Sequence, residues 1–244
     1  MKDFEYKSID EPGAQTLAVI GKAGKFNQYM YQTIRPFCKG NILEIGSGTG
    51  NISQYFLDDG ASLMLSDFRE VYCKDLQLKF KDAPNVTGIK VLDLVDPKFD
   101  EKFKGLFNCF DTIFAINVLE HIANDQLAVR NCYKLLQNSG NLVILVPAYQ
   151  QLYNHFDEAL EHYKRYTMKT LVPLFTNAAF RIIHKQYFNA MGILGWYVSG
   201  KLQKNKTLLE WQMRLYNKFV PAFKLIDKVT LHAIGLSVIV VGEK

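Results

Sequence analysis

A glycine-rich loop that directly follows a short apolar run constrains the fold of this chain most. Run and loop together read ILEIGSGTGN at residues 42–51, with glycine at every second position of the loop: Gly46, Gly48 and Gly50. Because glycine lacks a Cβ, such a loop can turn tightly and allow a ligand close to its backbone. The pattern predicts a buried strand whose carboxyl end carries a small-molecule site.

Strand patterns and helix patterns alternate along the first 150 residues or so. Five strands are predicted, at residues 41–45, 62–67, 86–93, 110–117 and 141–147. The helices predicted around them cover residues 27–37, 51–60, 70–83 and 125–140, the last ending at Gly140. This alternation predicts a doubly wound, mostly parallel α/β sheet with ligands at the carboxyl ends of its strands. A helix at 168–179 and strands at 180–188 and 236–244 would complete a seven-stranded sheet.

Bulk composition excludes several classes of protein. The chain has 244 residues and a net charge of +5, without the dense basic patch of a dedicated nucleic-acid binder. The N-terminal MKDFEYKSID lacks the apolar stretch of a signal peptide, and no apolar run approaches the roughly 20 residues of a membrane span. The four cysteines form no Cys-x-x-Cys pair, which is typical of thiols in a reducing compartment. We therefore expect a cytoplasmic protein with no nucleic-acid partner.

Acidic residues at the strand ends narrow the choice of ligand. A triphosphate loop would end in Gly-Lys-Ser or Gly-Lys-Thr, whereas Asn51 follows Gly50 here. Glu44 would repel the pyrophosphate of a dinucleotide but attract a cofactor with an ammonium and a sulfonium group; alternatively it caps loop amides. Asp67 ends the second strand and can accept both hydroxyls of an adenosine ribose. Asp93 ends the third strand, where it either accepts the adenine amine or caps a helix.

Four motifs in this order, ILEIGSGTGN, LSDF, VLDLVD and NVLEHI, resemble the class I S-adenosylmethionine-dependent methyltransferases over about residues 26 to 147. The resemblance implies an enzyme with a Rossmann-like sheet, an antiparallel last strand, and S-adenosylhomocysteine as the product of its cofactor. The residues that the resemblance places around the cofactor are Phe26, Tyr29, Glu44, Gly46, Ser47, Gly48, Asn51, Asp67, Phe68, Asp93, Leu94, Asn117 and Val118.

The segment after the fifth strand carries the candidates for contact with the acceptor. Residues 145–167 read LVPAYQQLYNHFDEALEHYKRYT and are similar to a bacterial methyltransferase subgroup associated with cell-envelope and glycan functions. Glu161 stands where that subgroup has glycine, which raises the question of a positive φ there. A hydroxyl acceptor must lose a proton, and the candidate bases are His162, His121 and His155. Candidates for binding the acceptor are Tyr149, Tyr163, Arg165 and Tyr166; alternatively these residues belong to a solvated turn.

Residues 189–233 are predicted to form a helical insertion between the sixth and seventh strands. The core domain would then comprise residues 1–188 plus 234–244, and two helices of the insertion would meet near Pro221. Aromatic residues and lysines are frequent in the insertion. It either packs on the core as a lid or presents an amphipathic surface for peripheral contact with a membrane or a lipid-linked acceptor.

These observations predict methyl transfer from S-adenosylmethionine to a small-molecule, sugar or lipid-linked acceptor, at oxygen. We expect no metal, because the fourth strand ends in Asn117 and not in the carboxylate that a metal-assisted catechol-type reaction would need. Two alternatives stay open. An NAD(P)-dependent oxidoreductase would need a proton-donor set such as Tyr-x-x-x-Lys, and a non-catalytic scaffold would keep the fold without the reaction.

Overall fold

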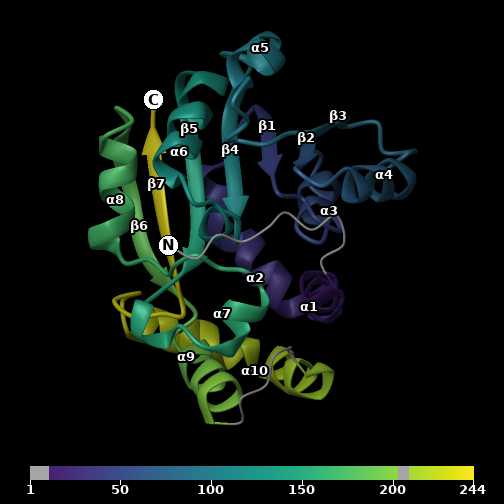
Figure 1. The fold of residues 1–244 in the computed structure, drawn as a ribbon. Coiled ribbons are helices and arrows are strands. Elements are labelled where there is room, and N and C mark those ends of the chain that lie inside the picture. The colour runs from purple at the N-terminus through teal and green to yellow at the C-terminus, as the bar shows by residue number, and fades with distance from the viewer. Residues whose placement is uncertain (1–10, 203–208) are drawn as a thin grey trace.

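A seven-stranded sheet with the strand order β3-β2-β1-β4-β5-β7-β6 forms the centre of the computed structural model, which describes residues 11–202 and 209–244 (Figure 1). The strands are β1 (Asn41–Ile45), β2 (Ser62–Asp67), β3 (Val86–Val91), β4 (Phe110–Ile116), β5 (Leu136–Pro147), β6 (Arg181–Phe188) and β7 (Ser237–Glu243). Strands β1 to β5 pair in parallel, and β7 runs antiparallel to both β5 and β6. The predicted doubly wound fold with an antiparallel last strand is confirmed.

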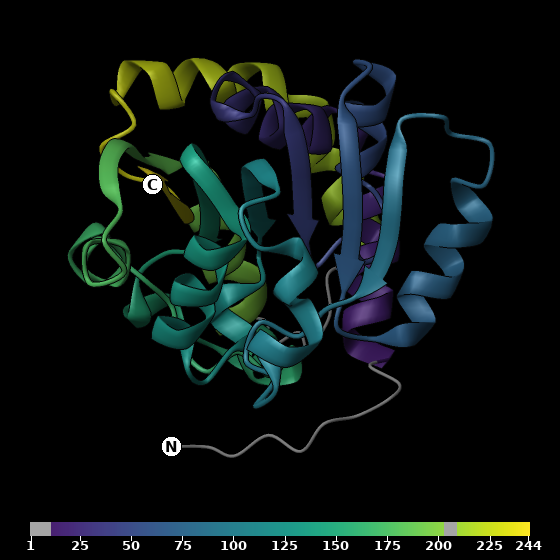
Figure 2. The ribbon, with the colours of Figure 1, turned by 90° about the horizontal axis from the view of Figure 1, so that it is seen from above.

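Both faces of the sheet are covered by helices (Figure 2). Neighbouring residues of one strand, such as Leu43 and Ile42, enter different hydrophobic clusters, because successive side chains point to opposite faces. Burial on both faces explains why the central strands are almost continuously apolar. The α-helices are α1 (Glu11–Gly21), α2 (Gly24–Ile34), α3 (Ser53–Asp58), α4 (Glu70–Lys79), α5 (Phe99–Phe103), α6 (Asp125–Leu135), α7 (His155–Ala159), α8 (Met168–Thr176), α9 (Gly192–Trp196) and α10 (Glu210–Val229).

Two of the predicted helices differ most from the structure. The helix predicted at 125–140 ends at Leu135, because Leu136 is already extended and pairs with Phe110 of β4. Asn, Ser and Gly at positions 138–140 are poor helix formers, which fits this early end. The two helices predicted to meet near Pro221 are one helix, α10, with Pro221 inside it. Proline disfavours a helix interior, but packing of Val220 and Tyr216 against the core outweighs that cost.

A helical insertion between β6 and β7 is confirmed, and a buried carboxylate attaches it to the core. The insertion contains α9, a π-helix at Tyr197–Leu202 and α10, which packs beside α2 although the two are far apart in the sequence (Figure 1). Asp227 of α10 is fully buried and accepts hydrogen bonds from the Tyr29 hydroxyl (2.6 Å) and the backbone amides of Asn189 (2.7 Å) and Ala190 (2.8 Å). The division into separate domains at residues 189 and 233 stays a prediction. Among the described helices, none has the length and apolarity needed to cross a bilayer.

Candidate active site

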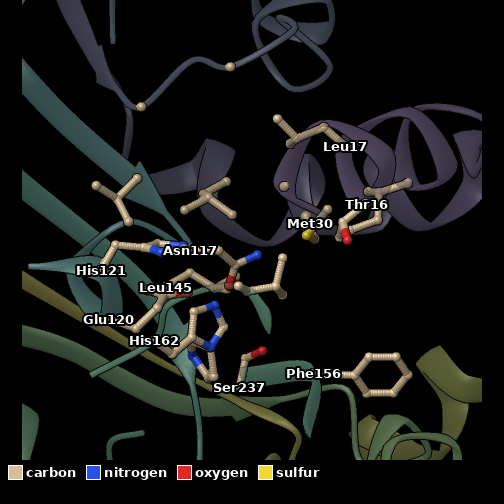
Figure 3. A pocket seen from close by; sticks show the side chains of 18 of the residues that line it. Thr16, Leu17, Met30, Asn117, Glu120, His121, Leu145, Phe156, His162 and Ser237 are labelled. Atoms are coloured by element: carbon tan, nitrogen blue, oxygen red, sulfur yellow. The ribbon is translucent and has the colours of Figure 1, made fainter. Parts of the chain in front are cut away.

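A cavity of about 1150 Å³ opens at the carboxyl ends of the central strands. It is lined by the loops after β1, β2, β3 and β4, by α1 and α2, and by parts of the insertion. Figure 3 shows Leu17 of α1 and Met30 of α2 on one side and Glu120, His121 and His162 on the other. The position is the one at which doubly wound sheets bind ligands. Its volume exceeds the roughly 300–1,000 Å³ typical of a pocket for one small molecule, so a cofactor and an acceptor can be bound together.

The glycine loop after β1 forms one wall of this cavity. Gly46, Gly48 and Gly50 all have positive φ, a conformation that other L-residues rarely adopt. At Gly46 space is restricted as well, since a Cβ would lie 2.4 Å from Cγ2 of Val118. The Ser47 amide donates a hydrogen bond to the Ser66 carbonyl (2.8 Å), which fixes the loop against β2. Glycine at position 46 thus lets the loop pass directly over the end of β4.

Glu44 is buried at the end of β1 and contacts both the loop and α3. It accepts hydrogen bonds from the side chains of Ser53 and Ser47, while its backbone carbonyl accepts one from the Ser66 hydroxyl (2.7 Å). Burial raises the pKa of Glu44 to about 7, against the opposing effect of these serine hydrogen bonds. Glu44 therefore contacts serine hydroxyls of the loop and of α3, where the structural alternative expected loop amides, and its side chain also lines the cavity.

The two aspartates at the ends of β2 and β3 also line the cavity. Asp67 accepts hydrogen bonds from the backbone amides of Gly48 (3.0 Å) and Arg69 (2.9 Å), one on each carboxylate oxygen. Its pKa is raised, chiefly by burial. Each carboxylate oxygen can accept a second hydrogen bond, so Asp67 keeps capacity for a ligand diol. Asp93 uses one oxygen to accept from the Val95 amide (2.9 Å), which leaves its second oxygen for a ligand.

Every residue predicted to contact the cofactor lines the cavity, except Tyr29. The prediction that Tyr29 contacts the cofactor is wrong, because Tyr29 lies on the side of α2 that faces the core and not the cavity. This helix presents Phe26, Asn27 and Met30 to the cavity, whereas Tyr29 points into the core and donates its hydroxyl hydrogen bond to Asp227. Met30 was not predicted, although its spacing of four residues from Phe26 is the helical signal that could have identified it. The predicted residues that do line the cavity are Phe26, Glu44, Gly46, Ser47, Gly48, Asn51, Asp67, Phe68, Asp93, Leu94, Asn117 and Val118.

Two of the predicted histidines meet on the opposite side of the cavity. His162 and His121 lie with their ring centroids 4.6 Å apart in an edge-to-face arrangement. Nδ1 of His162 is 2.8 Å from Oδ1 of the fully buried Asp157, and the same oxygen accepts a hydrogen bond from Nε of Arg165 (2.9 Å). Asp157 therefore fixes both side chains. Desolvation of its ring among the surrounding side chains lowers the pKa of His121 well below its ordinary value, and the neighbouring His162 lowers it further, although part of the residue's surface stays open to the cavity.

Glu120 lies beside these histidines and was not predicted (Figure 3). Its carboxylate is buried, and within the described part of the chain neither oxygen has a hydrogen-bond partner. Burial raises the pKa of Glu120 to about 8. Glu120, His121 and His162, termed the Glu-His-His cluster below, each offer one ligand atom, and these atoms lie within 4.8 Å of one another. His121 is in contact with solvent because it faces the open cavity.

Three residues predicted on the acceptor side do not line the cavity. His155 is exposed, with Nδ1 3.3 Å from Glu158, and Tyr149 stacks on Tyr187 at 5.1 Å. Tyr166 is buried and donates a hydrogen bond to Asp125 (2.9 Å). It points away from the cavity because its neighbour Arg165 points toward it, and adjacent residues of an extended segment point in opposite directions.

Tyr163 and Arg165 do line the cavity, together with the preceding residues Leu160, Glu161 and His162. Glu161 has the positive φ suspected from its alignment with glycine (58°). The contact of Asp157 with His162 was not predicted, because nothing in its spacing identifies it as the partner of that histidine.

Comparisons with known proteins agree with this arrangement. Residues 43–142 match a family model described as a methyltransferase domain. The chain is similar to (S)-coclaurine N-methyltransferase of Papaver somniferum, with 22% identity over 203 residues that cover 78% of this chain and 53% of the plant enzyme. It is also similar to the probable polyketide synthase 42 of Dictyostelium discoideum, with 27% identity over 149 residues. That match covers 52% of this chain and 6% of the synthase, so the chain spans about half or less of these relatives.

Two solved structures share the fold over most of the chain. A SAM-dependent methyltransferase from Archaeoglobus fulgidus has a TM-score of 0.58 and 19% identity, covering 89% of this chain and 94% of the archaeal chain. Phosphoethanolamine N-methyltransferase 2 of Haemonchus contortus, in complex with S-adenosyl-L-methionine, has a TM-score of 0.62 and 13% identity, covering 96% and 58%.

Proposed function

We propose that this chain, whose residues 43–142 match a methyltransferase domain, is a class I S-adenosylmethionine-dependent methyltransferase. We propose further that it methylates an oxygen atom of a small-molecule, sugar or lipid-linked acceptor. One observation carries the proposal. A single cavity joins the glycine loop and Asp67 on one side to the Glu-His-His cluster on the other. A cofactor bound along the loop would direct its methyl group toward that cluster.

The cofactor roles follow from the groups available on the loop side. We propose that Asp67 accepts the ribose hydroxyls and that Asp93 and Leu94 hold the adenine. Asn117 and Val118, at the end of β4, would contact the methionine part, and Phe26 would cover the cofactor from α2. Positively charged groups of the cofactor suit this site because it contains the two buried carboxylates of Glu44 and Asp67.

On the acceptor side we propose that His162 handles the proton of the reacting hydroxyl. Asp157 occupies Nδ1 of His162, which leaves Nε2 for the acceptor. The acceptor oxygen attacks the methyl carbon, the carbon–sulfur bond breaks, and its electron pair stays on sulfur. The protein contributes alignment of the two molecules and removal of the proton, while the cofactor supplies the reactive methyl group.

The insertion favours an acceptor with a large apolar part. Trp211, Leu215 and Phe219 recur every four residues along α10 and line the cavity, yet 58%, 52% and 48% of their surfaces are exposed. A helix face of this kind is amphipathic, and its apolar side is available to an acceptor. We therefore place a lipid-linked or otherwise apolar acceptor ahead of a free sugar.

Cofactor binding separates the proposed function from its alternatives. We expect S-adenosylhomocysteine to bind the full chain with one-to-one stoichiometry in calorimetric titration, and NAD(P) not to bind. Transfer of a labelled methyl group to an apolar hydroxylated acceptor should then be detectable. Binding of NAD(P) alone would favour the oxidoreductase, whereas cofactor binding without transfer to any acceptor would favour the scaffold.

Peripheral membrane contact through the insertion is a related proposal. Exposed apolar side chains on α9 and α10 lie in the same part of the chain as several lysines, a combination that binds anionic membranes. We expect the protein to co-sediment with vesicles that contain anionic lipid and less with neutral vesicles. Replacing Trp211 and Phe219 together by serine should reduce this binding, while Leu78→Ser on the distant helix α4, where Leu78 is also exposed, should not. Equal loss in both variants, or no binding to either vesicle, would rule out this contact.

A further inference from the structure

We propose that Glu120, His121 and His162 bind a divalent transition-metal ion of the zinc class inside the acceptor side of the cavity. The three residues lie together in Figure 3 and present two imidazole nitrogens and a carboxylate oxygen within 4.8 Å of one another. Two imidazoles and one carboxylate are a ligand set that zinc and similar ions accept in catalytic sites, where further positions stay open for water or substrate. These ligands differ from the carboxylates of a metal-assisted catechol-type site, which the sequence argues against because Asn117 ends the fourth strand.

Each histidine already has the second contact that metal-binding histidines need. In metal sites the ring nitrogen that does not bind the ion usually donates a hydrogen bond to a carboxylate or a backbone carbonyl, which fixes the ring. Nδ1 of His162 is 2.8 Å from Asp157, and the His121 ring hydrogen-bonds to the backbone carbonyl of Leu160. One nitrogen of each ring therefore remains for an ion.

Glu120 supplies the strongest argument. Its two carboxylate oxygens are buried and have no hydrogen-bond partner in the described ranges 11–202 and 209–244. Arg165, the nearest buried cation, uses its Nε and Nη1 for Asp157 and for the carbonyl of Ala148. A buried carboxylate without a partner is costly, and a bound cation would satisfy both its oxygens and its charge.

The distances allow binding after a small movement. Ligand atoms at about 2.1 Å from one tetrahedral zinc ion are about 3.4 Å apart, so the widest pair in the cluster has to approach by up to about 1.4 Å. Rotation of the Glu120 side chain, which no hydrogen bond holds, can provide this contraction.

The role of such an ion, unlike its binding, rests on the proposed function. An acceptor hydroxyl bound at an open position would release its proton to solvent more readily, because the cation stabilises the resulting oxygen anion. The oxygen would then attack the methyl carbon as described above, and His162 would act as a ligand to the ion and not as a free base.

Metal titration tests the site directly. The full chain would be freed of metal with a chelator and titrated with Zn²⁺ and with Co²⁺, whose visible absorption reports the ligand geometry, in the presence of S-adenosylhomocysteine. We expect one ion per chain, and at least tenfold weaker binding for each of Glu120→Gln, His121→Gln and His162→Gln. Asp157→Asn should weaken binding by about 10- to 100-fold, as expected for the partner of a metal-binding histidine.

A matched control exists on α7, where His155 and Glu158 form a comparable but exposed histidine–glutamate pair. The double variant His155→Gln/Glu158→Gln should bind the ion like the wild type. Retained affinity for S-adenosylhomocysteine would show that each variant is folded. If the wild type binds neither ion at micromolar concentration, or if the control loses binding as much as the cluster variants, the inference is wrong. Failure of S-adenosylhomocysteine to bind would instead overturn the proposed function, and the metal titration could still be read by itself.

Discussion

The His162→Gln variant should lose about 10²- to 10⁴-fold in kcat while its affinity for S-adenosylhomocysteine stays close to that of the wild type. Glutamine keeps a donor that can reach Asp157, so the buried Asp157–Arg165 pair retains a partner and the fold is preserved. What the variant loses is the second ring nitrogen that faces the acceptor. The measurement is a steady-state rate with a labelled methyl group, combined with calorimetric titration of the product cofactor.

The matched control for this variant is His155→Gln. His155 lies on the surface with Nδ1 near Glu158, and it does not line the cavity, so its replacement should leave kcat unchanged. A His162→Gln enzyme with the wild-type rate would remove His162 from the reaction.

The Asp67→Asn variant should bind S-adenosylhomocysteine about tenfold to several hundredfold more weakly. A hydrogen bond to a charged group contributes about 1.5–3 kcal/mol, and Asp67 is positioned to accept one or two from the ribose. An amide also presents an NH₂ group to either the Gly48 or the Arg69 amide, where the carboxylate presents only acceptors. Calorimetric titration gives the affinity, and thermal unfolding shows how much of the loss comes from the fold.

Asp58→Asn provides the comparison for this measurement. Asp58 is an exposed aspartate at the end of α3, where it accepts a hydrogen bond from Gln54 (2.8 Å). Its replacement removes the same charge without touching the cavity, and we expect the affinity to stay within experimental error of the wild type. If both variants lose affinity equally, the effect is one of net charge and Asp67 does not bind the ribose.

Much of the fold and of the cofactor side could be predicted from sequence because the signals there are local. The glycine loop, Asp67 and Asp93 each stand directly at the end of an apolar strand. Once the strand is predicted, the residue is therefore expected at the carboxyl edge of the sheet, where ligands bind. The error at Tyr29 is an error of helical phase: Tyr29 and Met30 are neighbours, but only Met30 faces the cavity. Sequence pattern identified the helix without specifying which of its two apolar sides meets the ligand.

The acceptor side resisted prediction because its contacts join distant parts of the chain. Glu120 and His162 are brought together only when the segment after β5 folds back over the end of β4, where the Tyr163 amide donates to the Glu120 carbonyl (2.8 Å). Tyr166 and its neighbour Arg165 were both predicted to contact the acceptor, yet Tyr166 points into the core while Arg165 lines the cavity. Similarly, α10 continues through Pro221 because of its packing against α2, which propensity alone does not reveal.

The buried carboxylate of Asp227 has a consequence for how relatives of this enzyme could acquire new acceptors. It joins α10, which borders the cavity, to Tyr29 of α2, and α2 also presents Phe26 and Met30 to the same cavity. Exchanging the segment between β6 and β7 for a foreign one would therefore disturb cofactor affinity as well as acceptor choice, unless the incoming helix brings an equivalent aspartate. We expect chimaeras that keep Asp227 to change their acceptor and still bind the cofactor.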